Sequence, residues 1–176
     1  MVFDFWACGP AANIKRKGEI ILRGAYPAKF LQHLKDALEY YPDRKYIAHI
    51  CAGSVPKKEG IRVDISPQFK PDIQADAENF ADAYLSKYFP AKLTIADPPY
   101  NDLRAIAYYK QKKVLSKIKM LKQMAMITDE GGLVGLLDHI SPSIGPHIPN
   151  LKRVALIGVT SLPNQDIRAF TLWRKI

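Results

Sequence analysis

The sequence predicts an α/β fold in which a mostly parallel sheet ends in an antiparallel hairpin. Three observations support this prediction. Five short apolar runs of the buried-strand type follow one another along the chain. Apolar residues recur at helical spacing before the first run and between later ones. The chain then closes with two strand-like runs around a polar turn, which is the pattern of a hairpin with a longer loop.

Most of the predicted strands lie in the first hundred residues. Residues 1–25 lack periodicity and are expected to form an irregular lead-in, with a short strand over 18–23. Pro27 opens a helical pattern, in which apolar residues recur at spacings of three and four, at Phe30, Leu31, Leu34 and Leu38. The strands expected next occupy residues 46–50, 61–65, 72–76 and 92–96. A short helix is expected over 77–89, between the last two of these strands.

The second half is expected to complete the sheet. Helical spacing of apolar residues extends over 103–126, and Gly131-Gly132 then turns the chain into a fifth buried strand over 133–138. A loop rich in proline, glycine and serine follows over 139–151, before the hairpin strands 153–160 and 167–174. Because no repeat or second core is visible, one domain over residues 1–176 is predicted.

Composition excludes several classes of protein. The 176 residues are 48% hydrophobic and 24% charged, which is typical of a globular domain and not of a disordered chain. No apolar run approaches the roughly 20 residues that span a bilayer, and the N-terminus lacks a signal-peptide pattern, so a cytoplasmic protein without membrane association is predicted. Two cysteines and four scattered histidines favour neither a disulfide scaffold nor a metal site.

Acidic or glycine-bearing positions end four of the predicted strands. These positions are the turn Cys51–Ser54, Asp64, Asp76 and Asp97. A single aspartate after a strand is most often a helix cap or a turn residue. However, open α/β sheets bind ligands at the carboxyl ends of their strands. Four such positions on successive strands therefore predict one shared crevice.

The sharpest signal is the run Asp97, Pro98, Pro99 and Tyr100. Two adjacent prolines stiffen the turn and force Asp97 into an extended conformation. The Asp97 carboxylate and the Pro98 carbonyl are both acceptors, which suits the two hydrogens of an exocyclic amino group. Tyr100 can stack on a planar ring, a contact worth about 1–3 kcal/mol per base. The alternative is an ordinary loop with a capping aspartate.

This run resembles the (Asp/Asn/Ser)-Pro-Pro-(Tyr/Phe/Trp) motif of S-adenosylmethionine-dependent amino-group methyltransferases. The resemblance implies the class I, Rossmann-like methyltransferase fold, with S-adenosylmethionine as cofactor and Asp97, Pro98, Pro99 and Tyr100 as catalytic residues. Asp in the first position favours adenine N6 in DNA, because Ser is commoner for cytosine N4. Hydrogen bonds to Asp97 and to the Pro98 carbonyl would hold the target amine in line with the methyl group, and such positioning supplies most of the rate.

The resemblance extends to the other strand ends, in the order of the family. Asp64 matches the acid that binds the ribose hydroxyls, and Asp76, followed by Ala77, matches the acid near the adenine amino group. Tyr26 and Pro27, at a helix start, are similar to the element that meets the methionine carboxylate, where helix N–H groups favour an anion. The glycine-containing loop that lies against the methionine part of the cofactor is matched by Cys51, Ala52, Gly53 and Ser54.

Two departures from the family pattern concern the cofactor loop and the first crossovers. The loop has the single glycine Gly53, where the family usually has two or three. The segment between the first two strands, residues 51–60, is shorter than a parallel crossover normally needs, and the next connection is shorter still. The helices there are therefore expected to be truncated or absent. The chain is either a minimal methyltransferase or a decayed one, and Asp64 and Asp76 favour a retained cofactor site.

The net charge of +9 favours a polyanionic partner where it is clustered. Between Asp102 and Asp129 there is no acid, but there are seven bases. Because this segment follows Tyr100 directly, it is interpreted as a phosphate-binding wall, and the alternative is a solvated lysine-rich surface. Six of these bases are the predicted nucleic-acid contacts: Arg104, Lys110, Lys112, Lys113, Lys117 and Lys119.

Several alternatives remain open for the function. The substrate could be RNA or a protein glutamine, although family members of those kinds more often carry Asn in the first position. The chain could also be a nucleic-acid-binding subunit without catalysis, which the single-glycine loop would suit. No segment is large enough for a separate target-recognition domain. Specificity must then come from the loops near 1–25, 101–112 and 139–151, from a homodimer or from another partner.

Overall fold

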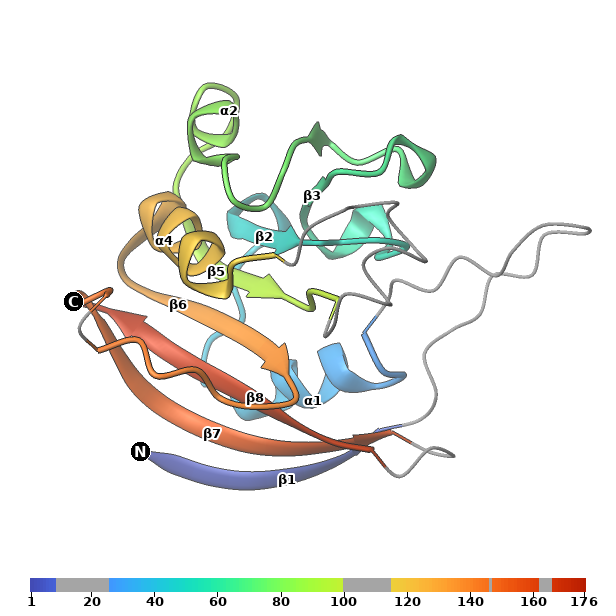
Figure 1. Cartoon of the computed structure of the whole chain (residues 1–176). Helices are drawn as coiled ribbons and strands as arrows, with labels where there is room; N and C mark the ends of the chain where they lie inside the picture. The colour runs from blue at the N-terminus through green and yellow to red at the C-terminus, as the bar shows by residue number, and fades with distance from the viewer. Residues whose placement is uncertain (9–25, 100–114, 146, 162–165) are drawn as a thin grey trace, which may run out of the picture.

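The computed structural model describes residues 1–8, 26–99, 115–145, 147–161 and 166–176. Its centre is one eight-stranded sheet in the order β1-β7-β8-β6-β5-β2-β3-β4 (Figure 1). Only the pairs that β8 forms with β6 and β7 are antiparallel, and every other neighbouring pair is parallel. The predicted fold class, a mostly parallel sheet with a C-terminal antiparallel hairpin, is therefore confirmed.

From β2 onward, most strands lie close to the predicted ranges. Their bounds are β1 (Val2–Cys8), β2 (Ile47–Ile50), β3 (Ile61–Asp64), β4 (Ile73–Gln74), β5 (Ala91–Ala96), β6 (Thr128–Asp138), β7 (Leu151–Ser161) and β8 (Asp166–Lys175). β6 begins earlier than expected, because Gly131, at a φ of +75°, lets the chain bend within the strand instead of ending it. The strand expected over 18–23 falls outside the described residues.

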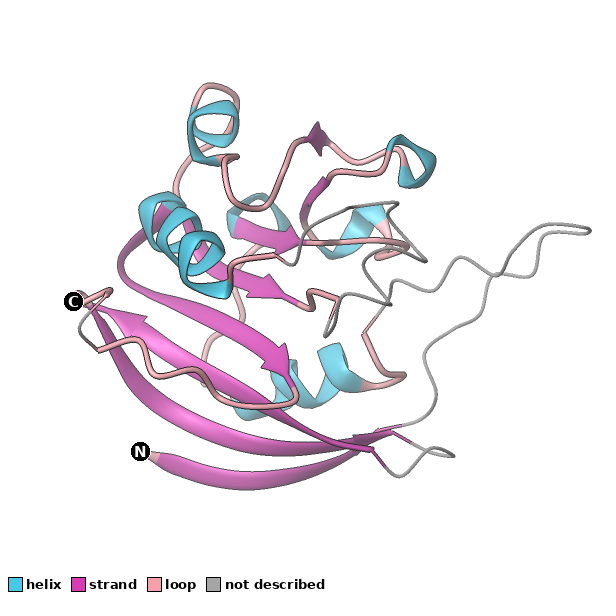
Figure 2. Ribbon diagram, in the orientation of Figure 1, coloured by secondary structure: helices cyan, strands magenta, loops and turns pink. Residues whose placement is uncertain are grey.

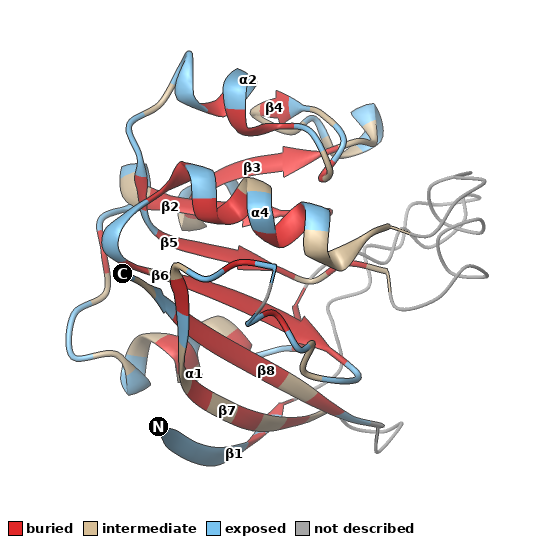
Figure 3. Ribbon diagram, turned by 60° about the vertical axis from the view of Figure 1, so that its left-hand side comes forward, coloured by how far each residue is buried: buried red, intermediate tan, exposed pale blue. Residues whose placement is uncertain are grey.

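Helices cover both faces of the sheet (Figure 2). α1 (Phe30–Ala37) packs on one face, and α2 (Ala81–Leu85) and α4 (Lys117–Ile127) pack on the other. Alternate residues of a strand point to opposite faces, so Leu93 and Ile95 join the α1 core while Ala96 joins the α2 and α4 core. Figure 3 shows the central strands buried between these layers. Among the described residues, no helix is both long and apolar enough to cross a membrane.

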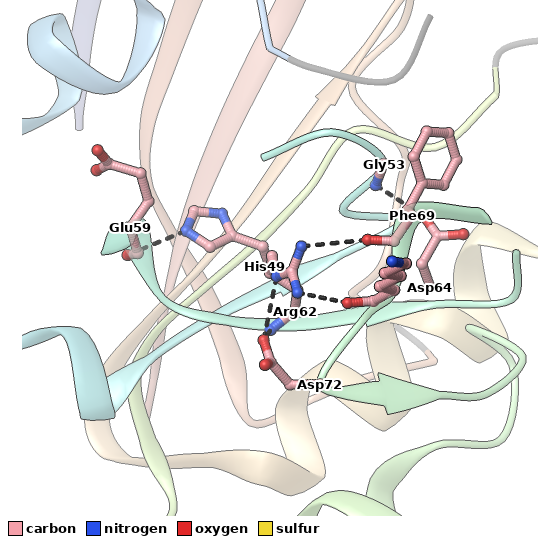
Figure 4. A network of polar contacts seen from close by, with 8 residues as sticks. His49, Gly53, Glu59, Arg62, Asp64, Phe69 and Asp72 are labelled. Carbon is pink, nitrogen blue, oxygen red and sulfur yellow. Dashed lines mark hydrogen bonds and ion pairs between the residues drawn. The ribbon is translucent and has the colours of Figure 1, made fainter. Parts of the chain in front are cut away.

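The first crossovers are reduced, as the short connections predict. A 3₁₀ turn, η2 (Lys57–Glu59), stands between β2 and β3, and another, η3 (Pro67–Phe69), stands between β3 and β4. Arg62 of β3 holds the second connection in place of a helix (Figure 4). Its guanidinium pairs with Asp72 at 3.1 Å and donates to two loop carbonyls, those of Phe69 and Lys70. Side-chain bonds thus satisfy carbonyls that a helix would have paired.

The N-terminal segment corrects one expectation. Residues 2–8 are not irregular, because they form the edge strand β1, which pairs in parallel with β7. No alternation signalled this strand, since only Trp6 and Cys8 of its seven residues are buried. Trp6 anchors it, with ring centroids 5.8 Å from Phe30 and 5.9 Å from Phe170. An edge strand that buries two side chains leaves little periodic pattern.

Candidate functional site

The candidate site lies where the strand order changes direction. β2 has β3 on one side and β5 on the other, and the chain moves outward from β2 in both directions. In open α/β sheets, ligands bind in the crevice outside the carboxyl ends at such a switch point. Ile50, the last residue of β2, pairs with Ala96, the last residue of β5. Cys51 and Asp97 therefore leave the sheet side by side.

The loop after β2 turns away from the sheet through two left-handed residues. Cys51 has a φ of +54° and Gly53 a φ of +50°. A non-glycine residue at positive φ costs about 1–3 kcal/mol and persists only where its surroundings impose it. Here the N–H of Ala52 donates to the Val63 carbonyl at 3.1 Å, and the N–H of Gly53 donates to Asp64 Oδ2 at 2.8 Å. Neighbouring β3 thus fixes the shape of the loop.

A small open cavity lies against this loop. The empty space at this place, counted together with the open solvent at its mouth, is about 340 Å³. The lining is largely apolar, with carboxylates from two different strand ends. Five of the residues predicted for the site contribute to it, namely Cys51, Asp64, Asp76, Ala77 and Pro99, and the rest of the lining is Val63, Ile65, Ala75 and Leu115. The structure thus brings together the acid that ends β3, the acid after β4, the loop after β2 and the proline turn after β5.

Asp64 is the most buried carboxyl of this group, at 2% exposure. One oxygen accepts the Gly53 N–H, and the other accepts the Ser66 N–H at 2.8 Å. Burial raises the pKa of Asp64, because the charged form loses hydration, while these hydrogen bonds and nearby Arg62 act in the opposite direction. A carboxylate has about four acceptor positions, so these bonds leave capacity for a ligand hydroxyl.

The electrostatic field in the crevice is negative. Burial raises the pKa of the Cys51 thiol well above its usual value, and Asp64, Asp97 and Asp76 raise it further. Cys51 is therefore a neutral thiol and not a nucleophilic thiolate. Because all three carboxylates disfavour a negative charge at Cys51, the same field favours a positively charged ligand beside it.

Asp97 has a cationic neighbour that sequence reasoning did not identify. Nη1 of Arg168 lies 3.4 Å from Asp97 Oδ1, and the two side chains are 10% and 15% exposed. Arg168 belongs to β8 and is separated from Asp97 by 71 positions in the chain. No local pattern joins the two residues, so this pair could not be found without the strand order.

The structure places Tyr26 in the core instead of among the cavity-lining residues. Its ring stacks on Phe30, and its hydroxyl lies 3.1 Å from His49 Nδ1 and 3.3 Å from the Ile95 carbonyl oxygen. Burial raises the pKa of Tyr26 well above its ordinary value, so the hydroxyl stays protonated. Pro27 is also buried, and its carbonyl accepts the N–H of Phe30 at the start of α1. These contacts give both residues a role in seating α1.

The remaining loop residues after β2 have mixed surroundings. Ala52 is buried, and Ser54 is half-buried. Asp76 accepts the Glu78 N–H at 2.8 Å, which fixes the turn that presents Ala77 to the cavity. Pro98 is buried directly after Asp97. The predicted catalytic Tyr100 lies outside the described residues.

The predicted phosphate wall is described only in part. Arg104, Lys110, Lys112 and Lys113 lie outside the described residues. The other two bases form ion pairs within the protein: Lys117 pairs with Asp138 at the end of β6, and Lys119 lies 3.3 Å from Glu78. The spacing along α4 had not indicated these partners, because both acids come from elements remote in sequence. Each of these ion pairs thus helps to hold α4 against the rest of the protein.

Together, the strand order, the terminal hairpin and the cavity at the switch point define a Rossmann-like class I methyltransferase fold. Solved structures of this kind are similar to the chain at low identity. The fibrillarin/Nop5p complex matches with 14% identity and a TM-score of 0.51, over 82% of this chain and 79% of that chain. TrmN from Thermus thermophilus matches with 14% identity and a TM-score of 0.55, over 82% and 48%.

A third similar structure is the N-methyltransferase NodS from Bradyrhizobium japonicum WM9. It has 10% identity and a TM-score of 0.51, and the match covers 73% of this chain and 84% of that one. At these identities the likeness shows a shared fold. No model of a protein family matches the sequence, and no curated protein matches it.

Proposed function

We propose that the chain transfers a methyl group from S-adenosylmethionine to an exocyclic amino group of a nucleic-acid base, with adenine N6 in DNA as the first candidate. One observation carries the proposal. Pro99 of the Asp-Pro-Pro turn lines the same cavity as Asp64 and Asp76. The turn that would hold the target amine thus borders the cavity that would hold the cofactor.

The residues of the cavity fit this cofactor. Val63, Ile65 and Leu115 provide apolar walls for a planar heteroaromatic ring. Asp64 and Asp76 offer acceptors for hydroxyl and amino hydrogens. The negative field at Cys51 suits a sulfonium cation. When bound, the cofactor would supply an electrophilic methyl group on positively charged sulfur.

The chemistry left to the protein is positioning. The carboxylate of Asp97 and the carbonyl of Pro98 are acceptors for the two hydrogens of an amino group, and together they would direct its lone pair toward the cavity. Holding the nitrogen in line supplies most of the rate. The nitrogen that gains a methyl group must also release one proton, and Asp97 is the carboxylate at hand to receive it. A target base in duplex DNA must first be flipped out of the stack.

The choice of substrate rests on the motif and on charge. Aspartate in the first position favours adenine N6, and the net charge of +9 favours a polyanion. RNA, a protein glutamine and binding without catalysis are the alternatives that the experiment separates. One similar structure, fibrillarin, is in complex with Nop5p. A partner protein that supplies target recognition is thus a further part of the proposal, as is a homodimer.

Two measurements on the full chain test this proposal. In the first, S-adenosylmethionine is titrated calorimetrically, and saturable binding is expected. In the second, the protein is incubated with methyl-labelled cofactor and separate pools of DNA, RNA and protein, and label is expected in adenine of DNA. Label in RNA or protein would replace the substrate class. Absence of cofactor binding would contradict the proposed methyltransferase activity. Nucleic-acid binding without cofactor binding would favour a non-catalytic subunit.

A further inference from the structure

Arg168 lies at the carboxyl edge of the parallel strands because β8 runs in the opposite direction. Its neighbour Ala169 pairs with Asp138, the last residue of β6, and Arg168 itself pairs with Val159 of β7. The first residues of β8 therefore stand where β5 and β6 end. The terminal hairpin, which has no assigned role in the site, brings a permanent positive charge to this edge.

The guanidinium is buried and faces Asp97. Nη1 lies 3.4 Å from Asp97 Oδ1, with the Arg168 side chain 10% exposed. β6 lies between β8 and β5 in the sheet, so the Arg168 side chain reaches past a whole strand. Burying a charge is costly unless it is paired and hydrogen-bonded, and a pair at this depth is screened little by water. The geometry therefore couples the state of Asp97 to Arg168.

The positive charge of Arg168 also acts on the end of strand β1. Cys8, the last residue of β1, is buried. Burial raises the pKa of its thiol, and the positive charge of Arg168 acts in the opposite direction. Arg168 thus lies within electrostatic reach of both the edge strand and the end of β5.

We infer that Arg168 is a positioning residue for the proposed methyl transfer, which keeps the Asp97 carboxylate ionised and fixes its orientation beside the cavity. The expected effect on methyl transfer rests on the proposed function, whereas the link between Arg168 and Asp97 rests on their ion pair. An ionised carboxylate accepts hydrogen bonds only, whereas a protonated one also donates. A protonated Asp97 would offer a donor where the target amine needs an acceptor, so Arg168 would extend activity to lower pH.

The test compares Arg168→Gln, Arg168→Lys and the control Lys175→Gln. Lys175 is at the other end of β8, where it pairs with Glu130 at 3.5 Å and donates to the Thr128 carbonyl. The control thus removes a charge from the same strand, away from Asp97. Thermal unfolding and affinity for S-adenosylhomocysteine are measured for each variant, so that a general loss of structure is recognised.

The first readout needs no activity. The titration midpoint of the Asp97 carboxyl is followed by ¹³C NMR in the ligand-free protein, with the signal assigned through Asp97→Asn. Loss of a neighbouring positive charge should raise this midpoint by roughly 1–3 pH units in Arg168→Gln. The midpoint should keep its wild-type value in Lys175→Gln and return close to that value in Arg168→Lys. An unchanged midpoint in Arg168→Gln would overturn the inference.

The second readout is the rate of single-turnover methyl transfer against pH. A misplaced carboxylate should lower the rate of Arg168→Gln by roughly 10- to 100-fold and move the acid limb to higher pH, with S-adenosylhomocysteine affinity unchanged. A wild-type rate and an unchanged acid limb in Arg168→Gln would contradict the positioning role. If the wild-type chain neither binds cofactor nor transfers methyl groups, the proposed function fails, and the NMR readout still decides whether Arg168 controls Asp97.

Discussion

Asp64 Oδ2 accepts the backbone N–H of Gly53 at 2.8 Å, and this bond ties the end of β3 to the loop after β2. The second oxygen of the same carboxyl accepts the Ser66 N–H. One buried side chain thus shapes the loop on one side of the cavity and the turn on the other. Asp64 has a structural role that precedes any contact with a cofactor.

Replacing Asp64 should affect stability and cofactor affinity together, whereas replacing Asp76 should affect affinity alone. Asp64→Ala leaves the buried Gly53 N–H without its acceptor, and such a group costs about 1–3 kcal/mol. Asp76→Ala removes a more exposed carboxylate whose bond to the Glu78 N–H is at the surface. Urea unfolding and calorimetric titration with S-adenosylmethionine measure the two effects. Equal stability of the two variants would contradict the structural role of Asp64.

Asp97→Ala should abolish methyl transfer while cofactor affinity stays close to wild type. The change removes both carboxylate oxygens, so the target amine loses the side-chain acceptor that would orient it. It also removes the negative charge that faces Arg168. Transfer of label to the preferred pool and calorimetric affinity are measured side by side. A matching loss of affinity would move Asp97 into the cofactor site.

The stability of the protein should fall between about pH 6.5 and pH 4 because of His49. Burial lowers the pKa of His49 from 6.5 to about 4, so in this range the unfolded chain binds a proton that the folded chain does not. Stability therefore falls as the pH falls, by about 3 kcal/mol once the pH is below both values. The raised pKa of Asp64 acts in the opposite direction.

Comparison with a variant that lacks the imidazole separates the contribution of His49 from that of the other titrating groups. The free energy of unfolding by urea is measured across the window for wild type and for His49→Gln, which can still hydrogen-bond. The difference between the two should shrink as the pH falls. A difference that is constant with pH would show that His49 titrates normally.

Lys117→Ala should destabilise the protein much more than Lys119→Ala. Lys117 pairs with Asp138, which is 1% exposed, and removing one partner of a buried pair costs roughly 3–5 kcal/mol. The low end applies, because the lysine side chain is itself 30% exposed. Lys119 is 60% exposed, and a surface pair of this kind contributes about 0–1 kcal/mol. Urea unfolding of the two variants gives the comparison.

The same two variants also test the predicted phosphate wall. Binding of a DNA duplex is measured against salt for wild type, Lys117→Ala and Lys119→Ala. If Lys119 contacts phosphate, its loss should reduce the salt slope by about one. An unchanged slope would show that Lys119 does not contact phosphate and would leave the ion pair with Glu78 as its role.

Much of the cavity could be predicted from residues close together in sequence. Asp64 ends one strand, Asp76 follows the next, and Pro99 comes shortly after β5, so the rule that parallel strands end at one edge was enough to group them. Tyr26 shows where this reasoning is weak. A helix start at a family-like position does not say whether the side chain faces the cavity or the core, and here it meets His49.

The sequence by itself indicated how strands and helices follow one another along the chain from residue 27 onward, and it placed acids at the carboxyl ends of the strands. These features depend on apolar periodicity and on turn residues, which act over a few neighbouring positions. Only the tertiary structure decided that β1 is an edge strand, that Lys117 meets Asp138 and that Arg168 faces Asp97. These pairs depend on which strands become neighbours and on how far a side chain reaches across the sheet. For Asp97 and Arg168 that contact joins positions 71 residues apart.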